Sequence, residues 1–301
     1  MDKPSEMSVF VEVARKGSFS AAARRLQLSP SAVSKLITRM EERLGSRLFN
    51  RTTRKLSLTE GGQRYFTRCV EILADIDAAE ELLAGYQQAP RGELTVSCSP
   101  GFARFQLLPI IPRFLELYPE LELNLQTSGE KVDLLSRSID VAIRLGTLKD
   151  SSLVARKLGE SHRIVCASPH YLEAHGTPKT PDDLLHHNCL TIAADKDFNR
   201  WVLNRGKRQQ IVSVSGNLVS NSVDSLYEMA LQGQGIINLA EFIVGPDLQS
   251  GRLVPLLKSY KSDSQLIHAI YPHRRHLPAK VRVFVDFLVG EFSSQWPRAK
   301  L

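Results

Sequence analysis

The sequence predicts a small helical head, a long connecting helix and a larger α/β domain. Residues 1–60 carry 12 Lys and Arg against 6 Asp and Glu, whereas residues 61–301 carry 27 against 26. Apolar residues recur at helical spacing to about Tyr86, and short strands then alternate with helices. A basic head on a nearly neutral body is typical of a protein that binds a polyanion, although a basic face can also be merely solvated.

The bulk composition is that of an ordinary globular protein, with 43% hydrophobic and 24% charged residues. No apolar run of about 18 residues occurs, so no membrane span is expected. The first ten residues lack the basic start and apolar core of a signal peptide, which predicts a cytoplasmic protein. Cys69, Cys98, Cys166 and Cys189 form no CxxC pair, so we expect reduced structural thiols, no metal site and no cofactor. A redox-sensing pair of Cys166 and Cys189 is the alternative.

The head begins with two short helices. Apolar residues over 7–14 mark the first helix, which ends at Lys16-Gly17. Ser18 or Ser20 can cap the second helix, which continues to Leu26. Its three alanines, residues 21–23, allow another helix to approach closely.

A third helix carries the residues expected to contact DNA. Ser29 is its N-cap, Pro30 occupies the first helical position, where a missing amide hydrogen costs nothing, and Gly45 ends it. Helical spacing turns one face to the core, with Val33, Ile37, Met40 and Leu44. Another face carries Ser31, Ser34, Lys35 and Thr38. Short hydroxyl side chains let a helix sit deep in the major groove, and Lys35 can reach a guanine edge or a phosphate.

A two-stranded ribbon is expected after the third helix. Leu48-Phe49 and Leu56–Leu58 form its strands, and residues 50–55 form a turn with three basic side chains. Such a ribbon looks like a wing that grips the DNA backbone beside the recognition helix.

These head residues resemble the LysR-type transcriptional regulators. The matching residues, in order, are Ser18–Ala23, Leu26, Ser29–Ser34, Glu41, Leu44-Gly45, Leu48-Phe49, Arg51 and Leu58–Gly62. The resemblance implies a winged helix-turn-helix that binds double-stranded DNA, acts as a homodimer or homotetramer and contacts RNA polymerase. The family often has Gln where this chain has Pro30, so base reading is expected to depend on Ser31, Ser34 and Lys35. The expected DNA contacts are Ser18, Ser20, Pro30, Ser31, Ser34, Lys35, Thr38, Arg39, Arg51, Thr52 and Arg54, with Thr52 and Arg54 assigned to the wing by resemblance.

A long helix is expected from Thr59 to about Tyr86. Its apolar stripe consists of Phe66, Cys69, Leu73, Ile76 and Leu83. Nothing in the small head is expected to bury this stripe, so we predict dimerisation along it, and packing on the chain's own body is the alternative. The expected boundaries are 1–60 for the DNA-binding domain, 61–87 for the linker helix, 88–92 for a hinge and 93–301 for the effector domain.

The last two hundred residues read as strands alternating with helices. The expected strands are 93–98, 121–125 and 140–144, the expected helices are 107–118 and 132–137, and a second βα region opens at Ile164. Segments 140–144, 167–172, 187–190, 233–236 and 251–254 match LysR-type effector domains. The resemblance implies an α/β domain of two lobes joined by two crossing strands and similar to periplasmic solute-binding proteins. Lobe one would span about 93–163 and 268–295, and lobe two about 164–267.

A small-molecule effector is expected between the lobes. Ligands of such sheets bind beyond the strand ends, where the amides of a helix N-terminus suit a carboxylate. The candidate residues are Ser99, Pro100, Gly101, Phe102, Thr127, Ser128, Arg144, Trp201, Asn221, Ser222 and Asn238. Three have a plain structural alternative: Ser222 as a helix cap, Trp201 as a core residue and Arg144 as the partner of a surface acid.

Two other classes of protein fit the sequence less well. No Gly-x-Ser-x-Gly elbow or Walker loop occurs, and Gly233-Gln234-Gly235 lacks the third glycine of a dinucleotide fingerprint. His186-His187 and His273/His276 have no clustered acids or cysteines beside them, which argues against a metal site. A solute-binding transport component would explain the lobes but not the helix-turn-helix. We therefore expect a transcriptional regulator and no enzyme.

Overall fold

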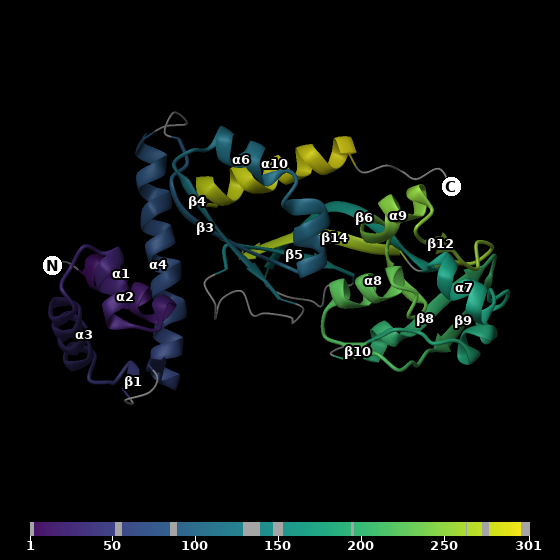
Figure 1. Cartoon of the computed structure of the whole chain (residues 1–301). Coiled ribbons are helices and arrows are strands. Elements are labelled where there is room, and N and C mark those ends of the chain that lie inside the picture. Colours follow the sequence, from purple (N-terminus) through teal and green to yellow (C-terminus); the bar gives the residue numbers. More distant parts are fainter. Residues whose placement is uncertain are drawn as a thin grey trace.

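The structure is a computed structural model, and it describes residues 3–51, 56–84, 89–128, 139–146, 153–193, 196–262, 264–272 and 277–295. The helical head, one long helix and a two-lobed body follow each other along the chain (Figure 1). Among the helices of these residues, none has both the length and the apolar character needed to span a membrane.

The head consists of three helices and a two-stranded ribbon: α1 (Lys3–Lys16), α2 (Phe19–Arg25), α3 (Pro30–Leu44), β1 (Phe49–Arg51) and β2 (Leu56–Leu58). The structure selects Ser18 as the cap of α2, because its Oγ accepts a hydrogen bond from Ala21 N at 3.3 Å. Ser29 Oγ caps α3 in the same way, from Ala32 N at 3.1 Å. Gly45 ends α3 in the left-handed conformation, with φ of 63°, as the sequence predicts.

Phe10 of α1 lies at the centre of the head's apolar core. Its ring packs edge-on against Phe49 of the ribbon at 5.4 Å between centroids. Val33, Ile37 and Met40 of α3 are buried in the same core, as predicted. Leu44, which the sequence also predicts in this core, is instead 36% exposed, because it is the last residue of α3 and lies beyond the core.

The long helix α4 (Glu60–Ala84) packs first on its own head. Phe66 and Cys69 are 3% and 0% exposed in the core around Phe10, and Leu73 is partly buried against that core. The expectation that Phe66 and Cys69 form a dimer seam is therefore wrong, because α1 of the same chain already covers them. Ile76 is half-buried, and Leu83 lies outside the described side chains.

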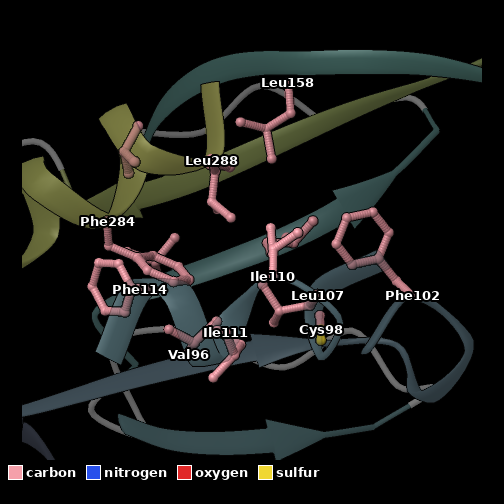
Figure 2. Close-up of a cluster of buried hydrophobic side chains, with 14 of the residues drawn as sticks. Val96, Cys98, Phe102, Leu107, Ile110, Ile111, Phe114, Leu158, Phe284 and Leu288 are labelled. Carbon is pink, nitrogen blue, oxygen red and sulfur yellow. The ribbon is translucent and has the colours of Figure 1, made fainter. Parts of the chain in front are cut away.

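Lobe one is a sheet covered on one face by helices. Its strands β3 (Gly92–Cys98), β4 (Leu121–Thr127) and β5 (Val141–Leu145) are parallel, with β3 in the middle. The helices are α5 (Pro100–Phe102), the π-helix η1 (Ala103–Leu107), α6 (Ile111–Leu117) and α10 (Ala279–Gln295). Phe114 of α6 packs against Phe284 of α10 at 5.1 Å, over the apolar side chains of the sheet (Figure 2).

The helix expected over 107–118 begins four residues later, at Ile111. Pro109 and Pro112 each lack an amide hydrogen, so one regular helix cannot continue through both. Pro112 instead lies in the first turn of α6, where the missing donor has no consequence. The helix expected over 132–137 lies outside the described residues.

Two long strands cross between the lobes, as the family resemblance implies. β14 (Ser264–Pro272) pairs with both β5 and β6 (Leu153–Ala167), and β6 continues into lobe two beside β11 (Ile237–Ala240) and β12 (Val254–Pro255). The resulting seven-stranded sheet has the order β11-β6-β14-β5-β3-β4, with β12 beside β6. The strand expected from Ile164 therefore begins eleven residues earlier, in lobe one.

Lobe two contains more antiparallel structure than predicted. Its remaining elements are α7 (Pro169–His175), η2 (Pro181–His186), β7 (Thr191–Ile192), η3 (Lys196–Asn199), β8 (Arg200–Arg205), β9 (Arg208–Ser213), β10 (Val219–Ser220), α8 (Val223–Leu231), α9 (Glu241–Ser250) and β13 (Lys261–Ser262). β8 and β9 form an antiparallel hairpin with β13 at its edge. Among the described residues of this lobe, parallel pairing is confined to the short β7–β10 ladder and one isolated bridge between Cys189 and Ile236. Repeated βα units therefore describe lobe one better than lobe two.

Candidate DNA-binding and effector-binding sites

The outer face of α3 carries the side chains expected to read DNA. Ser31, Lys35 and Arg39 are exposed and Ser34 and Thr38 are half-buried, on the side opposite the core residues of α3. α3 lies on the side of the head away from the body, so its outer face does not meet the lobes (Figure 1). The structure thus brings together, on one face, five of the six residues of α3 that the sequence predicts as DNA contacts; the sixth, Pro30, is its first residue.

Glu41 holds the ribbon against α3. Its Oε1 accepts hydrogen bonds from Leu48 N at 2.8 Å and from Phe49 N at 3.2 Å. A carboxylate that binds two backbone amides fixes the angle at which the ribbon leaves the helix. Arg43 of α3 also forms an ion pair with Glu6 of α1 at 2.7 Å, which joins α3 to the rest of the head.

The other expected DNA contacts have different surroundings. Ser20 and Pro30 are exposed, and half-buried Ser18 uses its hydroxyl to cap α2. Arg51 is the last residue of β1. Thr52 and Arg54, the expected wing contacts, lie outside the described residues.

Two of the expected effector contacts are core residues. Phe102 is fully buried, and its ring packs edge-on against Phe242 and Phe292 at 5.8 Å each. Trp201 is 1% exposed within the apolar core of lobe two. Both predictions are wrong, because apolar neighbours of the same chain occupy the space around each ring. For Trp201 the structure favours the core alternative.

The loop after β3 lies at the boundary between the lobes. Ser99 Oγ caps α5 by accepting a hydrogen bond from Phe102 N at 3.4 Å, and Pro100 is half-buried beside it. A Cβ on Gly101 would lie 3.2 Å from Ile243 Cδ1 of α9, so lobe one meets lobe two closely here and a larger residue would require the Ile243 side chain to shift. Gly101 therefore has a packing role at this boundary.

The other polar candidates differ in exposure. Thr127 and Asn221 are exposed, whereas Ser128 and Ser222 are half-buried. Ser222 occupies the N-cap position of α8, as the structural alternative expects, but its side chain makes no cap hydrogen bond. Asn238 is the second residue of β11 and is 3% exposed, and its Oδ1 has no hydrogen-bond partner among the described residues.

Arg144 is half-buried on the face of the lobe-one sheet that faces away from α6 and α10. Its Nη1 donates to Ile143 O at 3.2 Å and its Nη2 donates to Ser97 Oγ at 3.4 Å. Burial lowers the pKa of the guanidinium, but an arginine remains charged at neutral pH. Among the described residues no carboxylate forms an ion pair with it. The expectation of a surface acid as its partner is therefore not met within this part of the chain.

Sequence reasoning missed the neighbours of Arg144. The register places Arg144 of β5, His268 of β14 and Lys157 of β6 side by side in one row. His268 Nδ1 is buried without a hydrogen-bond partner in the described part of the protein, and burial followed by the charge of Lys157 lowers its pKa. One signal was available, because His268 interrupts the apolar run from Leu266 to Ile270 in the crossing strand.

Arg104 also escaped the sequence analysis. It lies in the π-helix η1 of lobe one and reaches two acids of α8 in lobe two, Asp224 at 3.7 Å and Glu228 at 3.6 Å. Its guanidinium lies 5.8 Å from the ring centroid of Tyr227. These contacts connect the lobes through charge as well as through packing.

The four cysteines are free and buried. Burial raises the pKa of Cys98 and of Cys189 to about 12, and it raises the pKa of Cys166 further. Because the thiolate is the reactive form of cysteine, this environment does not favour the redox-sensing alternative.

Comparison with known proteins agrees with this architecture. Residues 4–63 match the model of the bacterial regulatory helix-turn-helix protein, lysR family, and residues 87–293 match the LysR substrate binding domain. An uncharacterized HTH-type transcriptional regulator of Haemophilus influenzae is 40% identical over 93% of this chain and 98% of its own length. The HTH-type transcriptional regulator CrgA of Neisseria meningitidis serogroup B is 39% identical over 96% of this chain and 97% of its own. The solved structure of CrgA superposes with a TM-score of 0.65 and 38% identity, over 97% of this chain and 99% of that one. The chain therefore belongs to the LysR family of DNA-binding transcriptional regulators, with an N-terminal helix-turn-helix and a two-lobed effector-binding domain.

Proposed function

We propose that the effector of this regulator is a small anion, with a carboxylate as its recognised group, bound at the lobe boundary around Arg144. One observation carries this proposal: Arg144 is a half-buried guanidinium with no carboxylate partner among the described residues, and it lies in one row with His268 and Lys157. A carboxylate satisfies such a guanidinium with short, charge-assisted hydrogen bonds.

Neighbouring polar groups support the same site. Ser97 Oγ already contacts Arg144. Ser99 follows the end of β3, Thr127 is the last residue of the adjacent strand β4, and Ser128 follows it. These hydroxyl groups can donate further hydrogen bonds to a bound carboxylate.

Thermal unfolding of the full-length protein with a panel of small mono- and dicarboxylates tests the effector proposal. A ligand at about 100 times its Kd adds about 2.7 kcal/mol to the unfolding free energy, which for a domain of this size raises Tm by several degrees. We expect such a shift for the wild type and for Arg156→Gln, which removes an exposed arginine of β6, but not for Arg144→Gln. A shift that persists in Arg144→Gln, or a response to uncharged compounds alone, would contradict the proposal.

We also propose that α3 enters the major groove and that Ser31, Ser34, Lys35 and Thr38 contact base edges or nearby phosphates. Three short hydroxyl side chains and the longer Lys35 on the outer face of α3 support this placement. The other predicted contacts would then lie beside the DNA backbone: Ser18, Ser20, Pro30, Arg39, Arg51, Thr52 and Arg54. Lysine and arginine contacts to phosphate release counterions, so binding should weaken steeply as salt rises.

Genome-wide mapping of bound DNA supplies the operator for testing the α3 proposal. With that operator, Ser34→Ala combined with Lys35→Ala should reduce affinity at least tenfold and relax the sequence preference, because each base contact contributes about 1–3 kcal/mol of discrimination. Arg64→Ala removes the same charge from an exposed position on α4 and should leave sequence preference unchanged. Unchanged preference in the α3 variant would exclude α3 as the reading helix.

We further propose that the protein acts in the cytoplasm as a dimer or tetramer and that bound effector changes its contact with RNA polymerase. Ile72 is 40% exposed on α4, and this exposed apolar side chain supports pairing of two α4 helices. Two further leucines are exposed near α6: Leu108, just before it, is 50% exposed, and Leu117, at its end, is 55% exposed. They suit a second contact, between lobe one of one copy and lobe one of another.

A further inference from the structure

We propose that the head docks on the body of the same chain through an electrostatic contact that sets where the DNA-reading helix points. One side is the basic patch, which we define as Arg15 and Lys16 at the end of α1 and Arg25 at the end of α2. The other side is the acidic pair, Glu93 of β3 and Glu122 of β4.

A direct ion pair joins the two sides. Arg25 Nη2 lies 2.7 Å from Glu122 Oε2, between residues 97 positions apart in the sequence. In the overall view α4 runs between the head on its left and the β3–β4 end of lobe one on its right (Figure 1). This ion pair therefore connects the DNA-binding domain with the effector-binding domain.

The acidic pair needs cations from elsewhere. Glu93 and Glu122 are direct partners in the parallel β3–β4 ladder, and like charges in that position repel each other. The nearby amine of the body, Lys280 Nζ, is already used: it contacts the carbonyl oxygen of Glu93 at 2.6 Å and Asp140 Oδ2 at 2.7 Å. The compensating charge for the two carboxylates comes from the head.

The ionisation of Glu93 agrees with this arrangement. Burial alone would raise the pKa of Glu93. A hydrogen bond from Asn124 Nδ2 at 2.7 Å and then the charges of Arg15, Lys16 and Arg25 lower that pKa below its usual value. All three cations of the basic patch thus favour the ionised form of a body carboxylate.

The docked head keeps its reading face free. α3 points away from the body, so the contact orients the reading face without covering it (Figure 1). Exposed ion pairs contribute little individually and are screened by salt, so docking is reversible and weakens as ionic strength rises. An effector that slightly changes the free energy of contact between head and body therefore shifts the fraction of molecules with a docked head.

The acidic pair lies on the same strand face as the proposed effector site. Glu93, Thr95 and Ser97 alternate with the core residues of β3, and Ser97 contacts Arg144. Glu93 and Ser97 are four positions apart along this strand, which corresponds to about 13 Å. This link to the effector rests on the proposed function, whereas docking itself does not.

Crosslinking of the full-length protein tests docking without DNA or effector. The four natural cysteines are buried, so cysteines introduced by Arg24→Cys and Glu120→Cys, which leave Arg25 and Glu122 in place, are the accessible thiols expected in the variant. We expect a thiol crosslinker to join them within one chain several-fold more efficiently than in a control that carries the same two cysteines together with Glu122→Arg. High salt should reduce the difference. A yield equal to the control, or crosslinks only between chains, would overturn the proposal.

Charge reversal provides an independent test. Glu122→Arg should separate head and body and enlarge the molecule in small-angle X-ray scattering, and Arg25→Glu should do the same. The double variant restores opposite charges and should return to the wild-type dimensions. Both positions are exposed, and thermal melts check that each variant is folded. Unchanged dimensions in both single variants, or no recovery in the double variant, would overturn docking and leave the effector experiment unaffected.

Discussion

Asp140 connects three elements of lobe one. Its Oδ2 accepts hydrogen bonds from Thr95 N of β3 at 2.9 Å and from Lys280 Nζ of α10 at 2.7 Å, immediately before β5 begins. Asp247 has a similar role in lobe two, where it is fully buried and bound by Arg252 and by the hydroxyl of Tyr227. Removing one partner of a buried charge leaves that charge uncompensated, so losing Arg252 or Tyr227 beside Asp247 should destabilise its lobe more than breaking an exposed ion pair does.

The cysteines give a prediction at the residue scale. With a pKa of about 12, Cys98 and Cys189 have only about one thiolate in ten thousand molecules at pH 8, and buried Cys166 has fewer. A colorimetric thiol reagent should therefore react very slowly with the native protein. In guanidinium chloride all four cysteines should react at once. Rapid modification of Cys166 or Cys189 in the folded protein would revive the redox-sensing alternative.

At the scale of elements, the start of α4 is held tightly against the ribbon. Gly62 N donates a hydrogen bond to Thr59 Oγ1 at 2.8 Å, and Thr59 Oγ1 itself donates to Arg47 O at 2.7 Å. A Cβ on Gly62 would overlap the carbonyl group of Leu48, so only glycine allows this approach. Gly61, one position earlier, has only ordinary contacts at 3.6 Å and beyond.

This difference makes the two glycines a matched pair of variants. Gly62→Ala should destabilise the head by about 1–3 kcal/mol through overpacking, lowering its Tm by several degrees and weakening DNA binding. Gly61→Ala should be neutral or slightly stabilising, because alanine is the better helix former. Thermal melts followed by circular dichroism measure both. Equal melting temperatures for the two variants would show that the ribbon can move away from α4.

At the scale of the whole molecule, the crossing strands β6 and β14 make the two lobes parts of one sheet. Lobe motion is therefore restricted by a continuous ladder, and further by the contacts of Gly101 and Arg104 across the boundary. The head is attached differently, through α4 and the exposed Arg25–Glu122 ion pair. A small free-energy change on effector binding therefore moves the head more easily than it moves one lobe against the other.

Local patterns predicted much of the head and of lobe one. Ser29, Pro30 and Gly45 set the ends of α3 because capping and left-handed backbone geometry depend on neighbouring residues. Alternation in β3 likewise predicts which side chains enter the core. Arg104 and His268 could not be assigned this way, because their roles depend on partners more than a hundred residues away. The prediction that Phe66 lies in a dimer seam is wrong for the same reason, because periodicity shows that Phe66 is buried but not which surface buries it.

The sequence by itself determined the basic DNA-binding head, the helix periodicity, the order of elements in lobe one and the family. These features depend on local charge, caps and hydrophobic spacing. Only the tertiary structure decided that Phe102 and Trp201 are core residues and that Arg144 stands beside His268. It also placed Arg25 of the head against Glu122 of the body. Burial and charge pairing arise from contacts between distant segments, so they become visible only when the chain is folded.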